Sequence, residues 1–190
     1  MYRPIAARQL HRPHVIRVRM MKEQALSGRE RPTVGRLAVY LVLTAAFTGL
    51  IAGGANAAGA YDWVYQDLDR PAWLLPGGLL TMFWVAKSML LAFALWSVER
   101  FGREGWRWLG AAGVLGTIAC GVAWTVTFFF MRDLSFSLLV VLASWVTTVF
   151  AAWAVGRASV GAGAFLWLPL IFQSYALAAS FEMMRLNTGL

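Results

Sequence analysis

One charged side chain stands alone in a strongly apolar part of this 190-residue chain. Lys87 lies about ten residues from either end of an apolar stretch, and an ion at such a position is by default a candidate functional group. Trp84, Lys87 and Leu91 recur at helical spacing, so we expect them on one face of a helix. Lys87 could then offer a cation to an acidic ligand in a central cavity. A purely structural role is the alternative.

The apolar stretches lack the residue sets that catalysis needs. They contain no pair of carboxylates, no His and no cluster of Cys and His, and no Gly-rich phosphate loop follows a strand pattern. General acid–base, nucleophilic and metal-assisted reactions depend on such groups. We therefore predict no catalytic residues, no metal site and no obligatory cofactor, and binding is expected rather than enzyme activity.

Aromatic residues and prolines gather in the segment 61–77, between two apolar stretches. The segment is too long and too aromatic for a plain connector. Trp and Tyr in this setting are typical of an aromatic belt at the membrane surface. A folded lid over the mouth of a bundle is the alternative, and the chemistry alone favours the belt.

Small residues recur at every fourth position in two of the apolar stretches. They are Ala45, Gly49, Gly53 and Ala57 in the first, and Ala112, Gly116 and Cys120 in the third. Such stripes let helix backbones approach closely. The spacing fits packing inside one bundle and dimerisation equally well.

The composition excludes a water-soluble domain and a disordered chain. Hydrophobic residues make up 59% and charged residues 14% of the sequence, and the mean hydropathy is +0.61; soluble domains average roughly 45–50% apolar. A membrane-spanning helix needs about 20 apolar residues. Five stretches qualify: 37–60, 77–98, 108–131, 134–155 and 162–184. The predicted fold is an all-α membrane protein, a five-transmembrane-helix bundle over 37–190.

The net charge of +8 belongs almost entirely to the N-terminal 36 residues, which carry nine Lys or Arg and two Glu. We interpret residues 1–36 as a basic, disordered cytoplasmic tail rather than a nucleic-acid-binding element. A cleavable signal peptide ending near Ala57 is a less favoured alternative. Because Lys and Arg mark the inner side of a membrane, we predict a cytoplasmic N-terminus and an external C-terminus.

The aromatic and proline pattern resembles the TspO/MBR family of tryptophan-rich sensory proteins and mitochondrial translocator proteins. The resemblance covers about residues 40–187 and includes the count of five spans. It rests on four motifs in the same order: Tyr65-x2-Leu68-x-Arg70-Pro71-x-Trp73-x2-Pro76-Gly77, then Trp84, then Trp124 with Phe128-Phe129 and Arg132, and finally Phe181-x3-Arg185-Leu186-Asn187. Lys87 stands where the family pattern is aliphatic.

The resemblance implies a homodimeric five-helix protein of the bacterial inner membrane that binds tetrapyrroles, such as a porphyrin or haem, or a sterol-like molecule. Its ligand pocket would lie between the helices, under the first loop. The implied ligand-binding residues are Tyr65, Trp73, Pro76, Trp84, Trp124, Phe128, Phe172 and Ser180; Trp73 and Pro76 would belong to a lid. Lys87 joins this set from its own chemistry rather than from the resemblance, as the cation that would meet a propionate. The implied dimer interface contains Ala112, Gly116 and Cys120.

From these residues we expect a membrane protein that binds a planar, largely apolar, acid-bearing ligand for its transport, sensing or disposal. Flat macrocycles stack on Trp faces in concave apolar sites, and a few polar groups fix their orientation. Three alternatives stay open. One is light- or oxygen-dependent breakdown of a bound porphyrin, and another is a divergent relative with another lipid-like ligand. The third is an assembly or regulatory membrane protein that acts through its basic N-terminal tail.

Overall fold

The computed structural model describes residues 32–188, which form helices and no β-strand. The long helices are α2 (Val34–Ala57), α4 (Gly77–Phe101), α5 (Glu104–Thr125), α6 (Leu134–Ala158) and α8 (Trp167–Thr188). Shorter elements are α3 (Ala60–Asp62), α7 (Val160–Phe165) and the π-helical turns η1 (Trp63–Asp67) and η2 (Val126–Phe130). The described part contains five helical spans long and apolar enough to cross a membrane. The predicted all-α, five-span fold is confirmed.

The helix ends differ from the predicted spans by a few residues. The first helix begins at Val34, because the Thr33 side chain accepts a hydrogen bond from the Arg36 backbone N–H at 3.4 Å. It ends at Ala57 rather than 60, since Gly59 takes a left-handed conformation with φ of 73°. The helices α4 and α6 continue past the predicted 98 and 155 to Phe101 and Ala158. The third predicted span, 108–131, is divided between α5 and the π-helical turn η2, and the fifth, 162–184, between α7 and α8. Most of the predicted tail, residues 1–31, lies outside the described residues.

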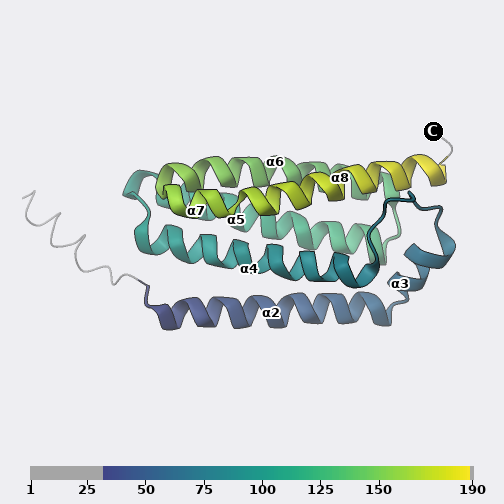
Figure 1. The fold of residues 1–190 in the computed structure, drawn as a ribbon, viewed down its shortest axis with the longest axis horizontal. Coiled ribbons are helices and arrows are strands. Elements are labelled where there is room, and N and C mark those ends of the chain that lie inside the picture. Colours follow the sequence, from purple (N-terminus) through teal and green to yellow (C-terminus); the bar gives the residue numbers. More distant parts are fainter. Residues whose placement is uncertain (1–31, 189–190) are drawn as a thin grey trace, which may run out of the picture. The chain divides into compact units, whose positions relative to one another are not determined.

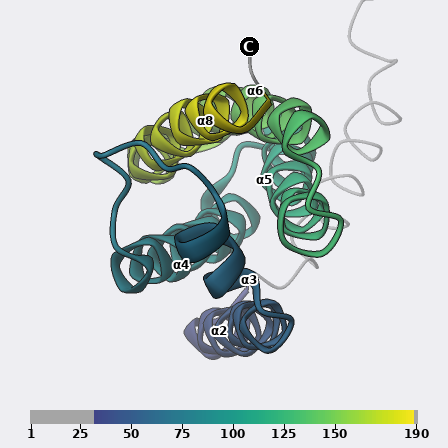
Figure 2. The same cartoon turned by 90° about the vertical axis from the view of Figure 1, so that its right-hand side faces the viewer.

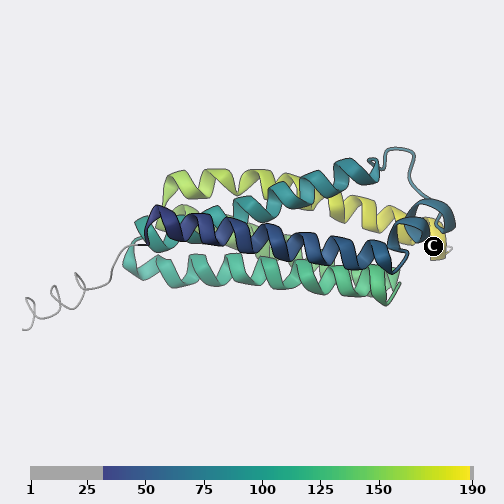
Figure 3. The ribbon, with the colours of Figure 1, turned by 90° about the horizontal axis from the view of Figure 1, so that it is seen from below.

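The described helices run side by side along one direction (Figure 1), with α2 on the outside of α4. The view along the bundle shows α6 and α8 together on one side, α5 beside α6, and α4 facing them across the interior (Figure 2). Seen from below, α2 runs along the outer face of the other helices (Figure 3). The interior therefore lies between α4, α5, α6 and α8.

One half of this interior is a solid apolar core. Leu91, Val114, Val155 and Leu166 are buried there with their neighbours from α4, α5 and α6. Gly113 allows α5 and α6 to touch closely, because a Cβ atom at this position would lie 2.9 Å from Ala151 Cα. The core fixes one end of the bundle and leaves the other end for a cavity.

Polar contacts attach the start of α2 to the end of α4. The Trp96 indole N–H donates to the Thr33 carbonyl oxygen at 3.0 Å. Tyr40 Oη donates to the Glu99 carboxylate at 3.0 Å, and Arg36 pairs with the same carboxylate at 3.4 Å. These contacts hold an otherwise exposed helix, of which only Thr48 and Ala55 are buried.

The small-residue stripe of α2 faces away from the bundle. Ala45 and Ala57 are exposed, and Cβ atoms at Gly49 and Gly53 would contact nothing within 4 Å. Intramolecular packing is therefore the wrong interpretation of this stripe in the described part of the chain.

Candidate functional site

A cavity of about 380 Å³ lies within the bundle at the end opposite the apolar core. Its wall is formed by α2, the segment from α3 to the start of α4, α4, α5 with η2, α6 and α8. This volume falls within the roughly 300–1,000 Å³ typical of small-molecule sites. The lining is predominantly aliphatic and aromatic, with a few polar side chains.

The structure brings seven of the nine predicted ligand-binding residues together around this cavity. They are Tyr65, Trp84, Lys87, Trp124, Phe128, Phe172 and Ser180. Trp73 and Pro76 are not among its lining residues. Trp73 is 48% exposed and sets its ring edge-on to Tyr175, with the ring centroids 5.7 Å apart, and Pro76 caps α4. Ligand contact by any of the nine stays a prediction.

Stacked aromatic rings form the cavity wall beside η2. Trp124 lies nearly parallel to Phe128, with a centroid distance of 5.0 Å and an interplanar angle of 15°. Trp63 packs edge-on against the same Phe128 ring at 5.2 Å. The wider π-helical turn at η2 follows directly on α5, and such turns are frequent at functional sites. The result is an aromatic, apolar wall on this side of the cavity.

The Trp124 indole nitrogen is an unsatisfied donor within this aromatic wall. Its Nε1 atom is buried and has no hydrogen-bond partner among the described residues. A buried N–H without an acceptor is costly, and Trp124 lines the cavity. The nitrogen atom itself is closed off from the cavity, so Trp124 contributes other parts of its ring to the lining.

Lys87 contributes the one charged group among the cavity-lining residues that the structure describes. Only 8% of this residue is exposed. Its Nζ atom donates to Gln173 Oε1 at 3.2 Å and lies 5.6 Å from the centre of the Phe172 ring. The predicted position of Lys87 on the Trp84 face of its helix agrees with both residues lining the cavity.

The segment between α2 and α4 folds over one end of the cavity. Tyr61, Val64, Tyr65 and Leu74 of this segment line it, and Trp63 is buried, with 8% exposed. Trp63 thus belongs to the interior of the molecule, and the belt interpretation fails for this residue. Tyr65 is partly buried, and Trp73 remains half exposed.

Side-chain hydrogen bonds hold this segment, which we term the lid (residues 60–76). Tyr65 Oη donates to the Leu75 carbonyl oxygen at 2.9 Å, and the Leu75 N–H donates to Tyr175 Oη at 2.8 Å. The Asp69 N–H donates to Asn187 Oδ1 at 3.0 Å, which ties the lid to the end of α8. Burial raises the pKa of the Tyr65 phenol above its ordinary value, so the phenol stays protonated as a donor at neutral pH.

Gln173 and Trp63 are two of the cavity-end residues that the sequence interpretation did not assign to the site. Gln173 is a lone amide inside an apolar span, a signal that could have marked it as a partner for Lys87. Without the order of helices around the bundle, nothing connected the two. Trp63 lay outside the register of the family pattern.

The predicted dimer residues lie on the outer face of α5. Ala112 is exposed, and Gly116 and Cys120 are partly exposed. The close contact with α6 uses Gly113 instead, one position away from Ala112 along the helix. The described protomer thus leaves the predicted stripe available to a partner.

Comparison with known proteins identifies relatives along most of the chain. The sequence model of the TspO/MBR family matches residues 38–186. The tryptophan-rich sensory protein of Cereibacter sphaeroides is 28% identical over 126 residues, which are 66% of this chain and 77% of that protein. Protein CrtK of Rhodobacter capsulatus is 29% identical over 158 residues, 80% of this chain and 92% of that protein.

Proposed function

The chain belongs to the TspO/MBR family, and from this premise we propose that it binds a tetrapyrrole, such as a porphyrin or haem, inside its helical bundle. It is a multi-pass integral membrane protein with five apolar spans. Binding would serve the sensing or transport of the ligand, or its disposal. The bacterial inner membrane is the proposed location.

The parallel pair of Trp124 and Phe128 beside the cavity carries this proposal. A planar macrocycle gains both apolar burial and face-to-face or edge contacts on such a wall. Trp84 adds a further ring from α4 to the lining.

A titration with protoporphyrin IX tests the proposal on the full chain in detergent micelles, followed through the porphyrin absorption band and through Trp fluorescence quenching. We expect saturable binding to the wild type and affinity roughly ten-fold weaker in Trp124→Phe, because that variant loses ring area in the cavity wall. Trp108→Phe is the matched control, since Trp108 is 67% exposed and does not line the cavity. Equal affinity in wild type and Trp124→Phe would contradict the site.

Illumination of the same complex separates binding from catalysis. A new porphyrin product formed in stoichiometric amount, and lost in Trp124→Phe, would favour the enzymatic alternative. Quenching without product favours the binding protein. No porphyrin binding at all, together with binding of a sterol, would favour the divergent relative with a lipid-like ligand.

The proposal includes a homodimer in which the outer face of α5 meets its copy through Ala112, Gly116 and Cys120. Their exposure supports this arrangement, and a Cβ atom at Gly116 would meet only Thr147 Cγ2, at 3.9 Å. Small residues at this spacing allow close helix contact in a membrane.

A further inference from the structure

Lys87 is a buried cation whose partner in the described structure is an amide, with no carboxylate among the cavity-lining residues. Charged side chains in protein interiors normally pair with an opposite charge, because an uncompensated buried ion is unfavourable. An ammonium group has three N–H donors, and the contact to Gln173 uses one. The Phe172 ring face, 5.6 Å from Nζ, compensates the charge only partly.

The Gln173 side chain extends this donor group. Gln173 is 3% exposed and lines the same cavity. Since Lys87 can only donate, the amide must turn its oxygen toward Lys87 and its NH2 group away from it. That NH2 group makes no hydrogen bond to the described residues. Two sets of unused donors, on Lys87 and on Gln173, therefore lie next to each other at the cavity wall.

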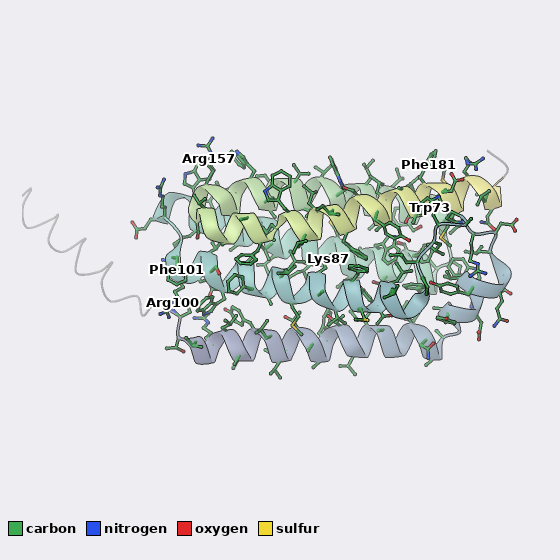
Figure 4. All side chains as sticks on the ribbon, in the orientation of Figure 1. Trp73, Lys87, Arg100, Phe101, Arg157 and Phe181 are labelled. Carbon is green, nitrogen blue, oxygen red and sulfur yellow. The ribbon has the colours of Figure 1, made fainter. Side chains whose placement is uncertain are left out.

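Two adjacent donor groups, one of them charged, match the two oxygens of a carboxylate. Such contacts are stronger in an apolar environment than in water. Lys87 lies ten residues into α4 and about midway along the bundle (Figure 4), whereas Trp124 lies at the last turn of α5 beside the lid. A ligand would place its acid deep in the bundle and its flat ring toward the lid.

We propose that Lys87 and Gln173 form a carboxylate clamp that makes the cavity selective for flat apolar ligands with a free acid. Esters of the same ring, which are neutral, leave the Lys87 ammonium uncompensated and bind less tightly. Sterols, which also carry no acid, do the same. This inference rests on the proposed function, because the clamp lies in the same cavity. It adds the chemical group that the ligand must carry.

A pair of porphyrins that differ only at the acid tests the clamp on the full chain in micelles. Protoporphyrin IX carries free carboxylates, and its dimethyl ester has the same ring without them. We expect the acid to bind wild type at least about ten-fold more tightly than the ester, which is the scale of hydrogen bonds to a charged group.

Two variants remove the clamp in different ways. Lys87→Met deletes the charge at similar length, and Gln173→Glu supplies an internal carboxylate beside Lys87 that competes with the ligand. Both should weaken acid binding about ten-fold and abolish the preference for the acid over the ester. Arg103→Met also removes one cation but lies exposed at the other end of the bundle, so it should keep the preference for the acid. Because Gln173→Glu gains an ion pair with Lys87, this variant should stay folded. Weaker acid binding in Gln173→Glu could then not be attributed to unfolding.

The outcomes separate the clamp from the proposed function. Equal affinity of wild type for acid and ester, or an acid preference that survives in Lys87→Met and Gln173→Glu, overturns the clamp and leaves porphyrin binding in place. Failure of both porphyrins to bind folded wild type overturns the proposed function, and the clamp with it.

Discussion

Phe128 is a buried residue that packs against several aromatic rings at the cavity end of the molecule. It is 4% exposed and contacts the rings of Trp63, Trp124 and Phe129 at centroid distances of 5.2, 5.0 and 5.0 Å. These contacts join the lid to α5. Residues on two separate segments thus depend on one side chain for their positions.

Phe128→Ala should destabilise the folded protein by about 3–5 kcal/mol, the cost of removing a buried Phe and leaving a cavity. In a chain of this size that corresponds to a fall in Tm of roughly 10 °C, measurable by circular dichroism in detergent. Phe136→Ala is the control, because Phe136 on α6 is 47% exposed. Similar losses in the two variants would show that the aromatic cluster contributes no particular stability.

Gly113 and Gly116 lie one helical turn apart on α5 but differ in what surrounds them. A Cβ atom at Gly113 would lie 2.9 Å from the Ala151 backbone, while one at Gly116 would meet only Thr147 Cγ2 at 3.9 Å. Gly113→Ala should therefore cost about 1–3 kcal/mol through overpacking, and Gly116→Ala should have little effect on the protomer. Thermal unfolding of the two variants side by side checks this, and equal stabilities would contradict the packing of α5 on α6.

The same comparison extends to the proposed dimer. Gly116→Leu should convert the dimer to monomers while the protomer stays folded, because a bulky side chain separates the two α5 helices. Light scattering coupled to size-exclusion chromatography measures the mass. Gly105→Leu, a substitution of the same kind at an exposed position with open space around it, should leave the mass unchanged.

At the level of elements, the lid is the part that depends most on single polar contacts. Tyr65→Phe removes the bond to the Leu75 carbonyl oxygen, worth about 1 kcal/mol. We expect faster hydrogen exchange in the lid and little change in the spans. Ser180→Ala, which alters the cavity wall outside the lid, should leave lid exchange unchanged, and unchanged exchange in Tyr65→Phe would contradict the role of this bond.

The raised pKa of Tyr65 gives the lid a dependence on pH. In the folded state burial keeps the proton on the phenol, whereas an unfolded Tyr loses it near pH 10. The stability contributed by Tyr65 is therefore complete below about pH 10 and is lost as the pH rises from there through the folded-state pKa. In absorbance titrations, the wild-type minus Tyr65→Phe difference should show a tyrosine that ionises later than a free one.

The spans were predictable because long apolar runs have few other structures available to them. Which face each helix turns toward its neighbours was not predictable in the same way. The sequence pattern selected Ala112 and Gly116 on α5, yet the close contact with α6 falls on Gly113, since that choice depends on which helix lies alongside. For the same reason Lys87 was identified from its type and depth, while its partner Gln173 required the position of α8 next to α4.

The lid shows a different limit of sequence interpretation. Its aromatic residues were visible in the sequence, and their chemistry favoured a surface belt. The π-helical turn η1 instead directs Trp63 and Val64 into the interior, where both are buried. Local composition gave no indication of this turn, because its position depends on packing against Phe128 and Met183.

Across the whole described molecule, charge separates the two ends of the bundle. The end where α2 begins carries five arginines and two glutamates among the described residues: Arg36, Arg100, Arg103, Arg107, Arg157, Glu99 and Glu104. The lid end carries five acids and three arginines: Asp62, Asp67, Asp69, Asp133, Glu182, Arg70, Arg132 and Arg185. Basic residues accumulate on the cytoplasmic side of membrane proteins, so we expect the lid and the cavity mouth to face outward.

Labelling of single cysteines in intact cells tests this orientation. The background is Cys120→Ala, which removes the one native Cys. In it, Gln66→Cys reports the lid end and Gly105→Cys reports the arginine-rich end. Both positions are exposed, and neither substitution changes the net charge. A membrane-impermeant maleimide should label Gln66→Cys directly and Gly105→Cys only after the membrane is permeabilised. The opposite pattern would reverse the orientation. A ligand that enters through the lid would then come from the cytoplasm.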